Sequence, residues 1–111
     1  MDPIEKRLHE LRELAAKYAK AEAQRVYIEE FKKSKLAQLM KSAEARGHAT
    51  AAAQEREARA SDQYVELLNG LQVATEEAER SRWELKIAEM GAELWRTQQA
   101  SLRAERRGYG A

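Results

Sequence analysis

The sequence predicts an all-α protein: a long antiparallel helical hairpin, coiled-coil-like, that dimerises into a helical bundle. Ala, Glu, Arg, Leu and Lys make up 69 of the 111 residues, which is typical of coiled coils and long helices. Only 18 residues are Leu, Ile, Val or Phe, but 20 basic and 19 acidic residues leave a net charge of only +1, which speaks against disorder. We expect one helical domain over residues 1–111.

The first long helix is expected over about residues 3–46, either continuous or as two helices with a kink near 22–27. Asp2 fits as the N-cap before a proline at the first helical position. Apolar residues follow at alternating spacings of four and three: Ile4, Leu8, Leu11, Ala15 and Tyr18. This stripe loses phase where Glu22 and Arg25 fall on it, and resumes at Phe31, Leu36, Leu39, Met40 and Ala43.

A connector with a short helix is expected over residues 47–60. Gly47 is suited to the residue that follows a helix C-terminus, because glycine adopts positive φ without strain. Thr50 is expected to start the short helix, and Ser61 with Asp62 is expected to cap the second long helix.

The second long helix, expected over residues 61–107, carries the clearest periodicity in the chain. Twelve positions keep an unbroken spacing of three and four residues, and ten of them are apolar or aromatic: Tyr64, Leu67, Leu71, Ala74, Ala78, Ser81, Leu85, Ala88, Ala92, Trp95, Gln99 and Leu102. We call these positions the seam. Small residues in its middle favour close packing of two helices. Residues 108–111 are expected to be a frayed tail.

Charge supports the hairpin. Residues 24–48 carry six basic residues and three Glu, whereas residues 49–79 carry seven acidic residues and two Arg. An antiparallel hairpin lays these segments side by side, where opposite charges favour the pairing.

A second apolar stripe lies off the seam and is formed by Trp83, Ile87, Met90 and Leu94. One partner helix cannot cover both faces of this segment. Either the first helix folds into additional segments, or a second protomer covers the stripe, and we expect the second, a homodimer. The same stripe, or the edge formed by Tyr27 and Phe31, could alternatively bind a helix of another protein.

Basic residues give the strongest functional indication. A first group, Lys32, Lys33, Lys35, Lys41 and Arg46, faces the acidic segment in the hairpin and is expected to be largely neutralised. A second excess lies near the C-terminus, where we name Arg96, Arg103, Arg106 and Arg107 as candidate nucleic-acid-binding residues. Arginines beside Tyr109 could contact phosphate while the tyrosine stacks on a base.

Catalysis finds little support in the sequence. The chain has no Cys, and its two histidines, His9 and His48, are not accompanied by repeated metal-ligand motifs. We therefore expect no enzyme activity, catalytic residue, metal site, cofactor or small-molecule substrate. No apolar run approaches the ~20 residues of a membrane span, so we expect no membrane association and a cytoplasmic location.

Three segments, RVYIEEFKKSKLAQLM (25–40), AAQEREARAS (52–61) and RWELKIAEMGAELWRTQQASLRAE (82–105), resemble a group of small uncharacterised bacteriophage and prophage proteins. The resemblance assigns no functional residue. It implies a phage-encoded accessory protein, in the host cytoplasm, that acts in DNA recombination or replication by binding a phage or host protein, DNA, or both. Two alternatives stay open: an interaction protein that inhibits or redirects a host factor, and a structural virion or assembly component.

Overall fold

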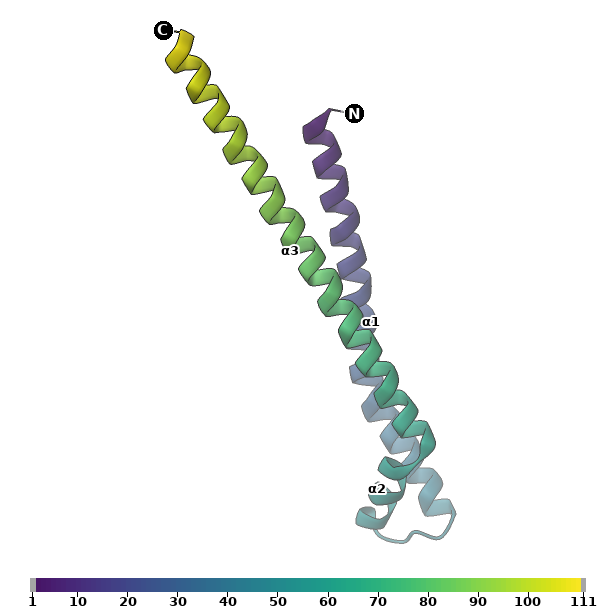
Figure 1. The fold of residues 1–111 in the computed structure, drawn as a ribbon. Coiled ribbons are helices and arrows are strands. Elements are labelled where there is room, and N and C mark those ends of the chain that lie inside the picture. The colour runs from purple at the N-terminus through teal and green to yellow at the C-terminus, as the bar shows by residue number, and fades with distance from the viewer. Residues whose placement is uncertain (1, 111) are drawn as a thin grey trace. The chain divides into compact units, whose positions relative to one another are not determined.

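The computed structural model describes residues 2–110, and of Tyr109 and Gly110 only the backbone. The described chain forms three helices: α1 (Pro3–Ala45), α2 (Ala51–Ala60) and α3 (Asp62–Gly110). Figure 1 shows that the short helix α2 connects the two long helices α1 and α3. This arrangement confirms the all-α helical hairpin. No helix in the described range is both long and apolar enough to cross a membrane.

The start of α1 is capped as expected. The Asp2 carboxylate accepts a hydrogen bond from the backbone N–H of Glu5 at 2.8 Å, and the Glu5 carboxylate accepts one from the Asp2 N–H at 3.3 Å. This reciprocal arrangement satisfies two backbone donors that a helix start leaves unpaired. From Pro3 onward α1 is one continuous helix to Ala45, with no break near residues 22–27. A kink within this helix stays a prediction.

The end of α1 depends on Gly47, which has a φ of +105°. The His48 N–H donates to the Ala43 carbonyl at 3.1 Å, and the Gly47 N–H donates to the Glu44 carbonyl at 3.0 Å. These two bonds form a Schellman motif, which satisfies the last carbonyls of the helix and turns the chain.

Two hydroxyls delimit the short helix that follows. The Thr50 side chain accepts a hydrogen bond from the Ala53 N–H at 3.1 Å and caps α2. Ser61 then donates to the Ala58 carbonyl at 2.7 Å and accepts from the Tyr64 N–H at 3.3 Å, so it ends α2 and caps α3 at once. Both caps agree with the sequence-based expectation.

The far end of α3 differs from the expectation. The helix continues to Gly110 instead of ending at residue 107, so a frayed tail from 108 is wrong for residues 108–110. Ala111, the last residue of the expected tail, lies outside the described residues. The hydrogen-bonded backbone of α3 therefore continues through Gly108, Tyr109 and Gly110.

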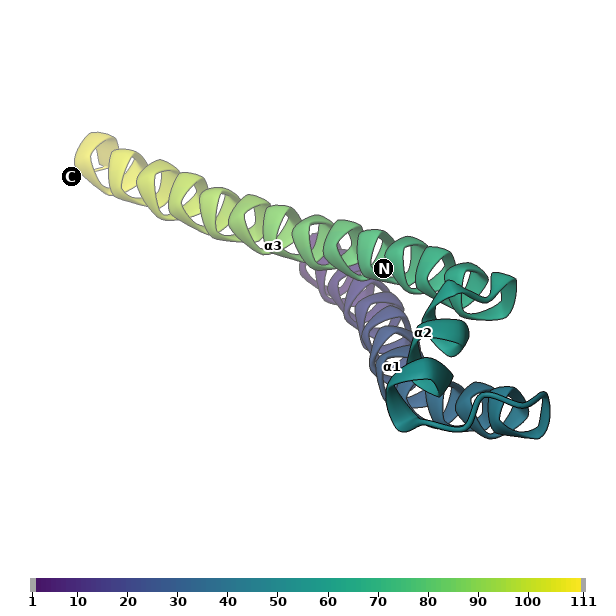
Figure 2. The ribbon, with the colours of Figure 1, turned by 90° about the horizontal axis from the view of Figure 1, so that it is seen from below.

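Contacts divide the chain into two units that share both long helices. Unit 1 combines Met1–Tyr18 with Arg80–Ala111, and unit 2 spans Ala19–Glu79. Each unit is an antiparallel pairing of a piece of α1 with a piece of α3, and unit 2 also contains α2, which Figure 2 shows beside the end of α1 and the start of α3. The division into two units favours two parts, whereas the two long helices that run through both units favour one. The single domain expected for residues 1–111 therefore stays a prediction.

The seam of α3 is confirmed along most of its length. In unit 2, Tyr64, Ala74 and Ala78 are buried, with 5%, 9% and 2% of their surface exposed. In unit 1, Ser81 is buried and the next seam residues are half-buried: Leu85, Ala88, Ala92, Trp95 and Gln99. Leu102 is 44% exposed, so the seam ends before it.

The matching face of α1 differs from the expected stripe. In unit 2 it does not lose phase: an unbroken three-four spacing of half-buried or buried residues runs through residues 22, 25, 29, 32, 36, 39 and 43. Charged side chains occupy the first four positions, and Glu22 pairs with Arg25 at 2.6 Å. In unit 1, Leu14 is half-buried in place of the expected Ala15, which is exposed.

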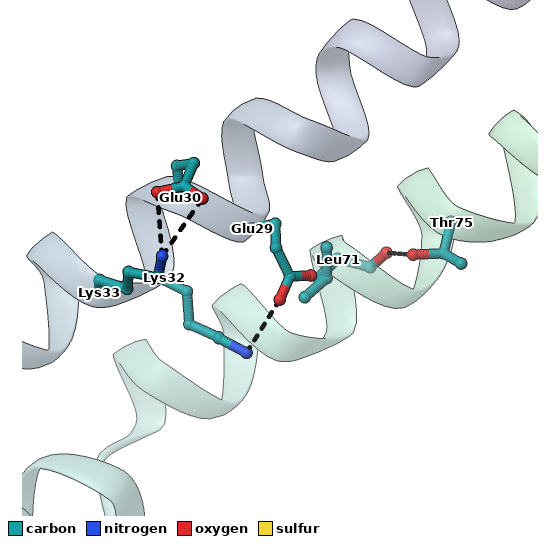
Figure 3. A network of polar contacts seen from close by, with 6 residues as sticks. All are labelled: Glu29, Glu30, Lys32, Lys33, Leu71 and Thr75. Atoms are coloured by element: carbon teal, nitrogen blue, oxygen red, sulfur yellow. Dashed lines mark hydrogen bonds and ion pairs between the residues drawn. The ribbon is translucent and has the colours of Figure 1, made fainter.

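Most of the measured ion pairs in unit 2 lie within single helices. Lys32 pairs with Glu29 at 3.4 Å and Lys33 with Glu30 at 3.1 Å, as Figure 3 shows. The first basic group is thus neutralised partly inside α1, whereas the sequence suggested neutralisation across the hairpin. In α2, the Arg59 guanidinium donates a hydrogen bond to the Glu55 carboxylate, which raises the pKa of Arg59. The same guanidinium lies 6.0 Å from the ring centre of Tyr64.

Candidate functional site: an arginine-lined groove in unit 1

Unit 1 has a groove of about 560 Å³ between the first turns of α1 and the later turns of α3. Its lining combines apolar side chains with basic ones. The residues that line it are Ile4, Arg7, Leu8, Leu11, Ala92, Trp95, Arg96, Gln99, Arg103 and Arg106.

The floor of the groove is apolar. Ile4 and Leu8 are 58% and 48% exposed, whereas Leu11 and Trp95 are half-buried. The sequence placed Ile4 and Leu8 in the packed stripe of α1, and this is wrong for both residues. The helices leave a groove here instead of closing on one another, since seam packing ends before Leu102. The groove therefore offers accessible apolar surface.

The rim of the groove is basic. Arg7 of α1 places its guanidinium carbon 4.8 Å from the ring centre of Trp95, a cation–π contact between the two helices. Arg96 pairs with Glu93 at 2.8 Å, and both side chains are largely exposed. Arg103 and Arg106, three residues apart, are exposed on the same side of α3.

No acidic side chain is among the residues that line the groove. Across unit 1 as a whole, 11 basic residues face eight acidic ones. Four arginines around an apolar floor can hold an anionic group by charge-assisted hydrogen bonds, while the floor accepts a planar or apolar part of the same ligand.

The structure thus brings together three of the four candidate arginines, Arg96, Arg103 and Arg106. Arg107 is exposed but is not one of the lining residues. The side chain of Tyr109 lies outside the described part of the chain. Arg7 was missed, because its place beside Trp95 follows from the register of the hairpin, which the spacing within either helix does not contain.

The second apolar stripe is exposed. Trp83, Ile87, Met90 and Leu94 have 50%, 61%, 54% and 66% of their surface exposed. Three of them border a shallow groove of about 800 Å³ together with Leu11, Lys86, Glu89, Ala92 and Glu93. The first helix does not fold into extra segments over this stripe in unit 1, so that alternative is wrong.

Another candidate surface of the sequence analysis, the aromatic edge of α1, lies in unit 2. The rings of Tyr27 and Phe31 stack with centres 6.1 Å apart and planes inclined by 6°. Tyr27 is 64% exposed and Phe31 is half-buried. The two rings contact each other, and this contact uses part of the apolar surface that a partner would need.

Within residues 2–110, no three His, Cys, Asp or Glu side chains come close enough together to hold a metal ion. His48 lies at the end of α1, with its Nε2 atom 3.9 Å from the Glu57 carboxylate. Comparison with protein-family models, with curated proteins and with solved structures found no match for this chain.

Proposed function

We propose that the protein is a non-enzymatic binding protein and that it holds nucleic acid in the arginine-lined groove of unit 1. One observation carries the proposal: Arg7, Arg96, Arg103 and Arg106 surround a single groove. Arginine forks match phosphate geometry, and the release of counterions from the backbone supplies most of the affinity of such contacts.

The apolar floor supports single strands more than duplexes. Unpaired bases expose flat apolar faces, whereas a duplex presents mainly phosphate and sugar. Because Arg7 stands over the ring of Trp95, a base that stacks there has to share or displace this guanidinium. The proposed role in DNA recombination or replication of a bacteriophage has its support only in the resemblance of residues 25–40, 52–61 and 82–105.

The test is fluorescence anisotropy with labelled single- and double-stranded oligonucleotides over a salt series. The parent chain is compared with a triple Arg96/Arg103/Arg106→Ala variant. Each lost phosphate contact should reduce the slope of log affinity against log salt by about 0.7 for a single strand. A triple Lys20/Lys41/Arg56→Ala variant is the matched control, because it removes the same charge from exposed positions of unit 2.

Binding that weakens with salt, and a slope that falls in the groove variant but not in the control, would support the proposal. An equal loss in both variants would indicate a nonspecific response to net charge. No binding at tens of micromolar protein would refute nucleic acid as the ligand.

The exposed apolar floor favours a second candidate, an acidic amphipathic helix of a partner protein. Ile4 and Leu8 offer apolar contact that a phosphate backbone does not use. A Leu8→Ser variant separates the two ligands. It should weaken binding of a labelled helical peptide with Leu on one face and Glu on the other, while it leaves the salt slope for oligonucleotides unchanged.

A further inference from the structure

The exposed stripe of α3 lies on the side of the helix away from α1. At about 100° per residue, the mean direction of Trp83, Ile87, Met90 and Leu94 is about 160° from that of the seam. Four neighbouring large apolar side chains, each at least half exposed, form a contiguous surface that α1 leaves uncovered, with only Leu11 of α1 bordering it. A stripe of this kind is the usual interface of one amphipathic helix with another.

The spacing of the stripe fits an antiparallel pair of identical helices. Its members are four, three and four residues apart, so Ile87 and Leu94 take heptad position a, and Trp83 and Met90 take position d. Antiparallel coiled coils pack a against d of the partner. A twofold axis between residues 88 and 89 does this for the whole stripe, because it pairs Trp83 with the partner's Leu94 and Ile87 with the partner's Met90.

The charges beside the stripe agree with the same register. Lys86 and Glu93 occupy successive g positions, and the twofold axis brings the g positions of two antiparallel helices together. Lys86 of one copy then meets Glu93 of the other, twice by symmetry. A parallel pair would instead place Lys86 opposite Gly91 and Glu93 opposite Gln98, with no pairing of opposite charge.

We propose that this surface is the interface of an antiparallel homodimer, in which α3 packs on α3 of a second copy through Trp83, Ile87, Met90 and Leu94. Lys86 stands over the Trp83 ring at 4.7 Å, so its ammonium group is already held at the edge of the stripe. Glu93 is 66% exposed on its side chain and remains accessible beside Arg96. The proposal is independent of what the arginine-lined groove binds.

Sedimentation equilibrium of the full chain tests the surface. The parent should be a dimer at tens of micromolar, and Ile87→Glu should weaken dimerisation at least tenfold, since it places a charge in the centre of the interface. Val26→Glu is the control: Val26 is 44% exposed on α1 in unit 2, so it lies on neither the stripe nor its helix. A monomeric parent, or a loss of dimer in the control and not in Ile87→Glu, would overturn the proposal.

A charge exchange tests the register. Lys86→Glu alone and Glu93→Lys alone should each weaken the dimer, because each places like charges opposite one another. An equimolar mixture of the two variants should dimerise again, since both pairs then have opposite charges. Circular dichroism of each variant checks that α3 stays helical. Variants that weaken the dimer but show no recovery in the mixture would exclude this antiparallel register.

Discussion

Replacing Ala78 with leucine should destabilise the protein, because Ala78 occupies the tightest part of the seam. Its surface is 2% exposed, and the neighbouring seam residues Ala74 and Ser81 are 9% and 1% exposed. Small side chains at these three positions allow the helices to approach closely. Leucine adds three carbon atoms where no space is open, so either the side chain leaves its preferred rotamer or the helices separate.

Overpacking of this kind costs about 1–3 kcal/mol. At about 4 °C per kcal/mol for a chain of this size, the melting temperature should fall by about 4–12 °C. The assay is thermal unfolding followed by circular dichroism at 222 nm. All variants are compared at one protein concentration, since self-association makes the melting temperature depend on concentration.

Leucine variants at two further alanines of α3 provide melting temperatures for comparison. Ala100 is exposed, and Ala and Leu differ little in helix propensity, so Ala100→Leu should leave the melting temperature nearly unchanged. Ala88 is half-buried, so Ala88→Leu should fall between the two. If Ala78→Leu melts within about 1 °C of the parent, or if Ala100→Leu loses as much, close packing at the seam is refuted.

Four other substitutions follow from local geometry, each measured by the same melts. Ser61→Ala should cost about 1 kcal/mol, because it removes the hydroxyl that caps α3. Gly47→Ala should destabilise the protein by more than about 1 kcal/mol, since its φ of +105° strains any side chain. Gly91→Ala should stabilise it by about 0.5–1 kcal/mol, because a methyl group there meets no other atom. Lys33→Ala should change stability by less than about 0.5 kcal/mol, because its ion pair is exposed and therefore screened; a larger loss would contradict this.

The course of α3 and its caps could be predicted because local rules determine them. Serine and threonine hydroxyls mark the helix starts, and a glycine marks the end of α1. The seam of α3 could be predicted because its residues are mostly apolar or small. Their low polarity and their three-four spacing therefore indicate the same buried face of the helix.

The face of α1 could not be predicted in the same way. Glu22, Arg25, Glu29 and Lys32 hold positions of the packed face, and a search for apolar residues passes over them. Long charged side chains can bury their aliphatic stems while the charged ends pair at the edge of the contact. Here Glu22 pairs with Arg25 and Glu29 with Lys32, so all four charges have a partner within α1. Tyr27, which looks apolar in the sequence, is 64% exposed.

The groove shows the same limit at the level of the site. Three of its four arginines lie close together in sequence and could be named, but Arg7 is far from them along the chain. Only the register of the antiparallel hairpin brings it to Trp95. A shift of α1 against α3 by one heptad would keep equivalent positions facing each other and move Arg7 away from the ring, so the sequence pattern alone does not determine the site.

The stripe and the groove both lie in the part of α3 that belongs to unit 1, but different residues form them. Variants of one surface can therefore test its proposed role separately from that of the other. About a twofold axis between residues 88 and 89, the two copies of Gln99 in the middle of each groove are about 30 Å apart along the helix axis, which is about nine base pairs of duplex. The groove is lined by the seam residues Ala92, Trp95 and Gln99, and the seam lies about 160° from the stripe, so the two grooves open on opposite outer faces of the dimer. One straight duplex therefore cannot occupy both grooves and gains nothing from their linkage. Ile87→Glu should weaken the dimer and leave the affinity of each groove unchanged, both for a 24-base-pair duplex and for a hairpin with six base pairs. Weaker binding of either oligonucleotide would mean that the variant disturbs the groove itself.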